Sequence, residues 1–289
     1  MGFEETMIAG LRKHVDQHKF DHGHALVLSG GVGRGGAARL SARGALRIGA
    51  GLVTLGCPPA ALVENASRLD AVMLQPVRDA QALYAMLEDR RISAVCAGPG
   101  FGLGAREAGF LEALIKLAGR RALPLVLDAD ALTLLARMPD GIPVLPVGSV
   151  LTPHEGEFAR IFPDLAADLP SSGDAEARAQ RRALVTLAAK RAGAVVLLKG
   201  ADTVIAQPDG RVWGQDATGP RAAPWLATAG SGDVLAGFLT GLCARGINSF
   251  DAARWAAFLH VECARDFGPG LIAEDLPEKL PDVLRRLGV

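Results

Sequence analysis

Short runs of apolar residues alternate along this chain with longer segments in which apolar residues recur every three or four positions. The short runs predict strands over residues 25–29, 52–56, 94–97, 123–127, 195–198, 203–206 and 211–214. The longer segments predict helices over residues 37–48, 105–118, 175–191, 234–245 and 251–267. Because such alternation is typical of a parallel sheet covered by helices, the pattern predicts an α/β fold with a mostly parallel central sheet.

The region after residue 202 departs from this alternation. Its two predicted strands are separated by Gln207-Pro208-Asp209-Gly210, a sequence typical of a tight turn, so we expect a β-hairpin appended to the sheet. The polar, turn-rich stretch 165–175 could be a linker between domains. Strands and helices alternate on both sides of it, so we interpret it as a surface loop and predict a single domain over residues 1–289.

Composition and charge limit the classes of partner. The 289 residues are 49% hydrophobic, which allows a large buried core. Lys plus Arg and Asp plus Glu each number 31, so no global field is available to hold nucleic acid or an anionic membrane. We therefore expect neither partner, and any phosphate site must be local.

Cysteines and the amino-terminal residues point to a reducing compartment. The four cysteines lie far apart and include no CxxC pair, which predicts reduced, buried thiols: Cys57, Cys96, Cys243 and Cys263. Residues 1–20 lack the continuous apolar segment of a secretory signal, and no apolar run reaches transmembrane length. We therefore expect a cytoplasmic location.

The histidines divide into three groups. Four crowd the amino-terminal region, where a solvated segment is a more common explanation than a metal site: His14, His18, His22 and His24. His260 falls on an apolar helix and is interpreted as a core residue. His154 lies in a polar segment before a short predicted helix, where its imidazole can reach a ligand, and the absence of HExxH spacing argues against zinc.

The turn from Gly230 to Asp233 is the strongest candidate for catalysis. Gly230, Ser231 and Gly232 precede the carboxylate of Asp233, and the apolar spacing that follows is helical. The free N–H groups of a first helical turn attract phosphate, so an acid here could take a proton from a hydroxyl that attacks this phosphate. Capping of the helix by Ser231 or Asp233 is an equally good explanation from this segment alone.

The ends of other predicted strands offer further candidates. Gly98-Pro99-Gly100-Phe101-Gly102 follows a strand and lacks the Gly-Lys-Ser/Thr of a P-loop, so it is a ligand-binding edge or a tight turn. Asp128 and Asp130 could bind Mg²⁺ or cap the next helix; we favour a solvated or capping role for Asp130 and leave Asp128 open. Lys199 could meet a nucleotide phosphate or extend into solvent.

Gly31, Gly33 and Gly36 have the GxGxxG spacing of a dinucleotide-binding fold and follow a predicted strand. That fold needs an acidic residue after its second strand, where this chain has Cys57-Pro58-Pro59. The missing acid argues against a dehydrogenase, although the glycines still permit close approach of some ligand.

Five segments occur together in a familiar order: GAARLSARGALRIGAGLVT, AGPGFG, LTPHEGEF, VVLLKGADT and TAGSGDVLAG. With them the chain resembles the ADP/ATP-dependent NAD(P)H-hydrate dehydratase family of the ribokinase-like superfamily, over residues 23–287, and specifically a stand-alone dehydratase. The resemblance implies a three-layer αβα sandwich. It also implies restoration of NADH or NADPH from the hydrated forms NADHX and NADPHX, with ADP or ATP as phosphoryl donor and with Mg²⁺.

The resemblance assigns roles to individual residues. The hydrated nicotinamide nucleotide should contact Ala37, Gly100 or Gly102, and His154, with Asp233 at the reactive hydroxyl as the catalytic residue. The adenine nucleotide should be held by Lys199, Gly200, Ala201, Asp202, Thr203, Gly230, Ser231 and Gly232. Metal ligands are not assigned. Arg34 and Gly35 depart from the family pattern in the loop that the resemblance assigns to the substrate.

The resemblance further implies metabolite repair by a homotetramer that is paired with an NAD(P)H-hydrate epimerase. Two other functions remain open from the residues. A small-molecule kinase of the same fold, acting on a thiazole, hydroxymethylpyrimidine or pyridoxal alcohol, would use the same Asp233. A nucleotide-binding sensor would bind ADP or ATP without turnover.

Overall fold

A nine-stranded sheet runs through the computed structural model, which describes residues 2–139, 141–170 and 173–289. The strand order is β3-β2-β1-β4-β5-β6-β7-β8-β9. The strands are β1 (His24–Leu28), β2 (Leu52–Cys57), β3 (Met73–Pro76), β4 (Ile92–Ala97), β5 (Leu125–Leu127), β6 (Val150–Leu151), β7 (Val195–Leu198), β8 (Asp202–Ala206) and β9 (Val212–Asp216). β1 to β7 pair in parallel, whereas β8 is antiparallel to both β7 and β9. The predicted mostly parallel sheet and hairpin are confirmed.

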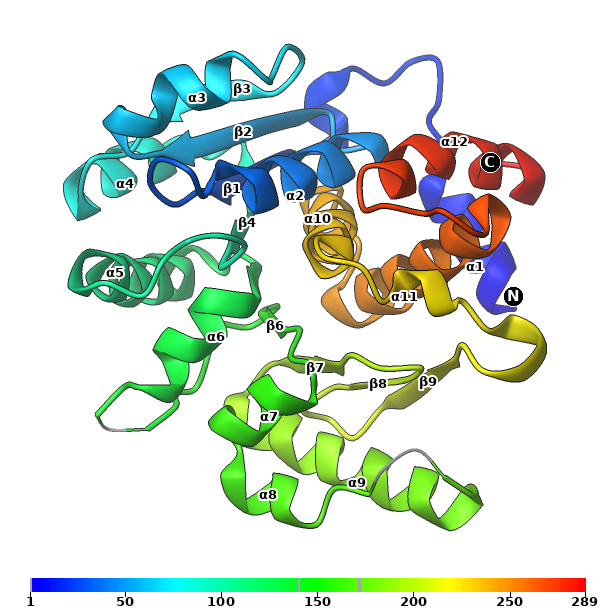
Figure 1. Cartoon of the computed structure of the whole chain (residues 1–289). Coiled ribbons are helices and arrows are strands. Elements are labelled where there is room, and N and C mark those ends of the chain that lie inside the picture. Colours follow the sequence, from blue (N-terminus) through cyan, green and yellow to red (C-terminus); the bar gives the residue numbers. More distant parts are fainter. Residues whose placement is uncertain (1, 140, 171–172) are drawn as a thin grey trace.

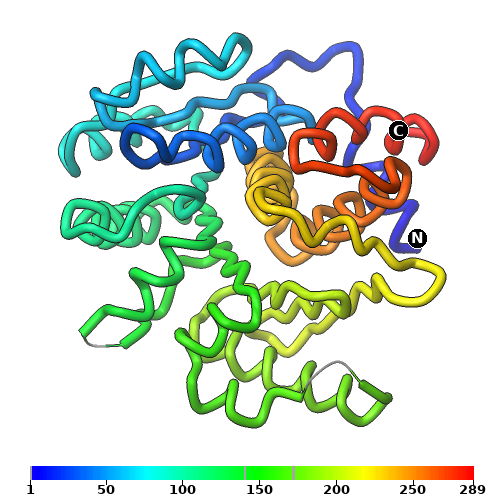
Figure 2. Tube along the Cα trace, in the orientation of Figure 1, coloured from blue at the N-terminus to red at the C-terminus, as the bar shows by residue number. Residues whose placement is uncertain are grey.

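Helices cover both faces of this sheet (Figures 1 and 2). Buried side chains of the sheet fall into two clusters, because successive strand residues point to opposite faces: Ala25 and Val27 face one cluster, Leu26 and Leu28 the other. The first cluster packs against α1 (Phe3–Leu11), α2 (Gly35–Arg47), α10 (Ser231–Ala244), α11 (Ser249–Phe267) and α12 (Asp275–Leu287). The second packs against α4 (Ala80–Leu87), α5 (Ala105–Arg121), α6 (Ala129–Ala136), α7 (Glu155–Ile161), α8 (Pro163–Ala167) and α9 (Ala175–Ala192). The three-layer αβα sandwich is therefore confirmed, with the short α3 (Leu62–Ala66) following β2.

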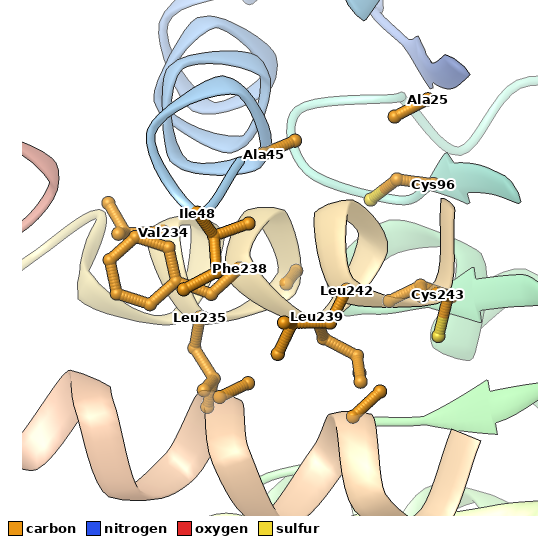
Figure 3. Packing of buried hydrophobic residues seen from close by; sticks show 14 of the residues in the cluster. Ala25, Ala45, Ile48, Cys96, Val234, Leu235, Phe238, Leu239, Leu242 and Cys243 are labelled. Carbon is orange, nitrogen blue, oxygen red and sulfur yellow. The ribbon is translucent and has the colours of Figure 1, made fainter. Parts of the chain in front are cut away.

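α10 is the central helix of the first cluster, buried all round from Val234 to Ala244 (Figure 3). Glycines let its backbone lie directly against α2. A Cβ at Gly237 would stand 2.2 Å from the carbonyl oxygen of Ser41, and one at Gly241 would stand 2.6 Å from that of Ala45. The hydroxyl of Ser41 also donates to the carbonyl of Asp233 at 2.8 Å. These contacts fix the first turn of α10 relative to α2.

Several local predictions need correction or addition. The histidine cluster is not uniformly solvated: His22 and His24 are buried, and His24 lies in β1 with Nε2 2.7 Å from the hydroxyl of Thr54. The predicted loop 165–175 begins inside α8, which ends at Ala167, while Ser171 and Ser172 lie outside the described residues. β3, β6, α1, α3, α4, α8 and α12 were not predicted. All four cysteines are buried and unpaired, as expected.

None of the helices in the described parts of the chain combines the length and apolar character needed to cross a bilayer.

Candidate active site

The site lies where the parallel strands end. Five connections leave the carboxyl edge of the sheet together, after β1, β4, β5, β6 and β7. They carry the glycine-rich loop 30–36, the loop 98–104, Asp128, His154 and Lys199, respectively. In an open α/β sheet this edge is where ligands bind, so the sequence-predicted residues converge because of the strand order and not because of their positions along the chain.

The turn before α10 is shaped by Gly230. Its φ of 91° lies in the left-handed region, and a Cβ there would stand 2.7 Å from Leu40 and 2.8 Å from Ala273. In the part of the chain that the structure describes, no side chain caps α10, and the hydroxyl of Ser231 donates instead to the carbonyl of Leu226 at 2.8 Å. The capping explanation for Ser231 and Asp233 therefore fails, and the first amides of α10 remain available for an anion.

The carboxyl of Asp233 is held in an environment that favours its protonated form. Burial raises the pKa of Asp233 to about 7, and the charge of Asp128 adds to this rise, while Lys199 opposes it. A carboxyl with such a pKa can accept a proton near neutral pH more readily than an ordinary, strongly acidic aspartate. This is the property that a general base requires.

Lys199, which is partly buried, forms an ion pair with the buried Asp128 beside this turn. Nζ of Lys199 lies 2.7 Å from Oδ1 of Asp128 and 3.6 Å from Oε2 of Glu157. The hydroxyl of Thr152 donates to the same Asp128 oxygen at 2.9 Å. Burial lowers the pKa of Lys199, but the neighbouring carboxylates Asp128 and Glu157 outweigh it and raise the pKa overall. Lys199 therefore stays charged inside the site, and its interpretation as a solvent-exposed strand-end lysine is wrong.

A pocket of about 570 Å³ opens between the β7–β8 turn, the segment 217–227 and helices α10 and α11. Of the residues that the resemblance assigns to the nucleotide, six line it: Lys199, Gly200, Ala201, Thr203, Ser231 and Gly232. A Cβ on Gly232 would stand 3.5 Å from Nζ of Lys199, so the lysine reaches the first turn of α10. One end of the pocket thus has the ammonium of Lys199 and the free amides of α10, and the rest of its lining is mostly apolar, which suits the planar ring of a nucleobase.

Asp202 and Gly230 do not line this pocket. Asp202 is buried, with Oδ2 3.6 Å from Nε of Arg178 on α9. Sequence reasoning missed residues of the segment 217–227 and of α11, because nothing in their local pattern marks them as pocket-lining. His260 is among them: it is buried as predicted, but it also lines the pocket.

His260 supports the turn before α10. Burial lowers the pKa of His260 to about 4, so the ring is neutral at physiological pH. Its Nε2 lies 2.9 Å from the carbonyl oxygen of Ser231, and in a neutral ring this nitrogen must carry the proton to donate there.

The residues assigned to the hydrated dinucleotide are brought together only in part. A Cβ on Gly100 would stand 3.4 Å from Cβ of Ala37, so these two residues are neighbours. Gly102 donates its amide to Oδ2 of Asp130 at 2.8 Å. His154 lies on the separate loop after β6, where Nδ1 accepts from the amide of Gly156 at 3.0 Å as the N-cap of α7.

A second groove, of about 630 Å³, runs along α2 and α12 from Gly36. Its arginines include Arg43 and Arg47, which both pair with Glu278 of α12. Because these guanidiniums already have partners, we assign the groove no chemistry.

Within the described residues no group of three or more His, Cys, Asp or Glu side chains has the geometry of a metal site. Mg²⁺ commonly binds through one or two carboxylates together with substrate phosphates and water, so a dedicated cluster is not required. The carboxylates that raise the pKa of Asp233 provide excess negative charge that fits such a cation.

The fold and this site define a ribokinase-like α/β protein with a pocket beside a partly buried carboxyl. A ribokinase-like superfamily protein from Enterococcus faecalis has the same fold, with a TM-score of 0.76 at 22% identity over 98% of this chain and 94% of that chain. The model of the NAD(P)H-hydrate dehydratase family matches residues 25–285, and the chain belongs to that family.

Two relatives of the family and one solved structure show the range of the similarity. The ADP-dependent (S)-NAD(P)H-hydrate dehydratase of Xanthomonas campestris is 33% identical over 284 residues, covering 93% of this chain and 90% of the relative. A bifunctional NAD(P)H-hydrate repair enzyme of Gloeobacter violaceus is 37% identical over 254 residues, 86% of this chain and 46% of the relative. The chain thus spans about half the length of the bifunctional relatives. The ADP/ATP-dependent NAD(P)H-hydrate dehydratase of Bacillus subtilis, crystallised with ATP and Mg²⁺, has a TM-score of 0.77 at 29% identity over 98% of this chain and 97% of that chain.

Proposed function

We propose that this chain catalyses the nucleotide-driven dehydration of NADHX and NADPHX, restoring NADH and NADPH. The proposal rests on one observation. Asp233, whose pKa lies near neutrality, stands beside the end of a pocket where the ammonium of Lys199 and the free amides of α10 come together. The names of the similar dehydratases supply the substrate and the donor, ADP or ATP.

The chemistry explains why a dehydratase has a kinase-like site. Hydroxide is a poor leaving group, so the ring hydroxyl must first be phosphorylated. Asp233 accepts the hydroxyl proton as the oxygen bonds to the terminal phosphorus and the bond from that phosphorus to the rest of the nucleotide breaks. Inorganic phosphate then leaves with its bonding electrons, and loss of a proton from the neighbouring ring carbon restores the double bond.

The chain's own groups stabilise charge during the transfer. The amides of Gly230 to Gly232 face the transferring phosphoryl group, and Lys199 offers its ammonium to the nucleotide phosphates in exchange for Asp128. Mg²⁺ would be held by those phosphates with Asp128, directly or through water, and would neutralise phosphate charge. Ala37, Gly100, Gly102 and His154 would bind the hydrated dinucleotide.

We further propose a cytoplasmic homotetramer of single-domain subunits that works with an NAD(P)H-hydrate epimerase. These proposals rest on the family resemblance. Analytical ultracentrifugation of the purified chain measures the oligomeric state directly.

One assay tests the proposed reaction. The protein is incubated with NADHX or NADPHX, Mg²⁺ and either ADP or ATP, and reduced-nicotinamide absorbance is followed together with inorganic phosphate. We expect both to rise in equal amounts, and the Asp233→Asn variant to lose at least ~100-fold of the turnover while still binding nucleotide. A stable phosphomonoester product would instead indicate a small-molecule kinase, and nucleotide binding without turnover would indicate a sensor.

A further inference from the structure

Asp130 joins two loops that follow different strands. Its Oδ2 accepts the amide of Gly102, in the loop after β4, at 2.8 Å. The same oxygen lies 4.0 Å from Nη1 of Arg34, in the glycine-rich loop after β1. The side chain of Asp130 is about one quarter exposed, whereas that of Arg34 is mostly exposed. Asp130 is therefore neither a freely solvated residue nor a helix cap, which corrects the role favoured from the sequence.

The backbone between the two neighbouring carboxylates explains how they serve different sites. Ala129 has a φ of 45°, in the left-handed region that a residue with a Cβ rarely adopts. With this bend, Asp128 contacts Lys199 on the nucleotide side, while Asp130 contacts Gly102 on the other side. Strained backbone of this kind persists when the surrounding contacts require it, and it concentrates at functional sites.

The glycine-rich loop is also held from its opposite side. Oε2 of Glu64, on α3, accepts the amide of Gly33 at 2.7 Å, and this hydrogen bond is the main reason that the pKa of Glu64 is lowered. Arg39 of α2 bonds to both Glu64 and Asn65. A Cβ at Gly35 would stand 2.5 Å from Arg39 and from Asn65, so Gly35 leaves the space that these side chains occupy. The departure of Gly35 from the family pattern thus has a packing reason.

We infer that Asp130 is a positioning residue for the hydrated dinucleotide, which it serves by fixing the loop of Gly102 to the loop of Arg34. The inference rests on the proposed function, since it takes Gly102 and Ala37 as substrate contacts. Among the described residues, Asp130 neither lines the nucleotide pocket nor contacts the Lys199 ion pair, so its contacts lie on the dinucleotide side. Its charge also helps to raise the pKa of Asp233, and for that reason the test is made at a pH where Asp233 is ionised.

Steady-state kinetics of four variants (Asp130→Ala, Asp130→Asn, Arg34→Gln and the double variant of Asp130→Ala with Arg34→Gln) test this role at about pH 8.5, where Asp233 is ionised. Asp130→Ala removes both contacts, and we expect the KM for NADHX to rise about tenfold, with kcat and the KM for ADP changed less than about twofold. Asp130→Asn keeps an acceptor for the Gly102 amide but loses the charge facing Arg34, so its KM should lie between those of wild type and Asp130→Ala. In the Asp130→Ala background, adding Arg34→Gln should change KM less than it does alone.

Hydrogen exchange gives a readout that does not depend on turnover. In Asp130→Ala, amides of peptides covering 30–36 and 98–104 should exchange faster, while those covering 199–203 and 228–235 should not change. Asp164→Asn, which removes a surface carboxylate paired with Arg191, is the matched control and should leave kinetics and exchange unchanged.

Each outcome decides between the alternatives. Two results would mean that Asp130 has only a general structural role and would overturn the inference. One is a fall in kcat together with similar rises in the KM values for NADHX and for ADP, and the other is faster exchange throughout the protein. Unchanged exchange in both loops would overturn it as well. A wild-type protein that does not turn over NADHX would refute the proposed function, whereas the exchange experiment would still decide whether Asp130 holds the two loops together.

Discussion

The charge of Asp233 should cost the folded protein stability, and its removal should stabilise the fold while lowering turnover at least ~100-fold. Burial and Asp128 raise the pKa of this carboxyl from 3.8 to about 7. At 1.36 kcal/mol for each pH unit, the ionised form is less favourable in the folded state by about 4 kcal/mol. The charge of Asp233 is therefore maintained at the expense of stability, and Asp233→Asn relieves that cost because the amide does not ionise.

The pH dependence has a defined sign. The folded state keeps a proton on Asp233 that the unfolded chain releases above about pH 4, so the wild type loses stability relative to the variant as pH rises from about 4 to about 7. The difference should be near zero at about pH 4 and constant above about pH 8. For a chain of this length, about 4 kcal/mol corresponds to a Tm increase of about 6 °C.

Thermal and urea unfolding of both proteins across this pH range measure the effect. Asp164→Asn is a useful comparison, because the hydrogen bonds from Arg191 lower the pKa of Asp164 to about 2 and its removal should not stabilise the protein at any pH. A Tm for Asp233→Asn that equals or falls below the wild-type value at about pH 8.5 would refute the reasoning. So would a stabilisation that is the same at every pH.

Three further predictions concern activity. Because Asp233 must be ionised to accept a proton, kcat/KM should fall tenfold per unit as pH drops below about 7, and a limb near pH 4 would contradict the raised pKa. Lys199→Met should raise the KM for ADP at least ~10-fold, because the phosphates lose their ammonium partner and Asp128 is left unpaired. If only the KM for NADHX changed, Lys199 would not be at the nucleotide phosphates. His154→Ala should raise the KM for NADHX more than that for ADP. If the thermal stability falls and both KM values stay unchanged, His154 acts only as the cap of α7.

The fold followed from the sequence where periodicity was long enough to be recognised. Five of the seven parallel strands and the hairpin were predicted, because each of these forms a distinct apolar run or turn. β6 was not predicted because it pairs over only two residues, and its neighbours β5 and β7, not its own pattern, make it a strand. His24 was misjudged for a related reason, since its burial depends on β1 lying beside Thr54 in β2.

The candidate site could be predicted residue by residue but not as a set of interactions. Asp233 and Lys199 could be recognised as candidates because each is a charged residue next to a glycine, at the start of a predicted helix and at the end of a predicted strand, respectively. The partnership of Lys199 with Asp128, 71 residues earlier, depends on the order of strands in the sheet. The contact of Asp130 with Gly102 depends in the same way on β4 and β5 being neighbours.

The close packing of α2 on α10 has a consequence for how this site can diversify. Ala37 lies near the amino-terminal end of α2, and Asp233 lies near the amino-terminal end of α10. The backbones of the two helices are in direct contact at Gly237 and Gly241. The separation between Asp233, the proposed base, and Ala37, a proposed substrate contact, is therefore set far inside the core, by residues with no side chain to vary. Changes in the strand-end loops can then alter which molecule is bound while the position of Asp233, the proposed proton acceptor, is inherited unchanged.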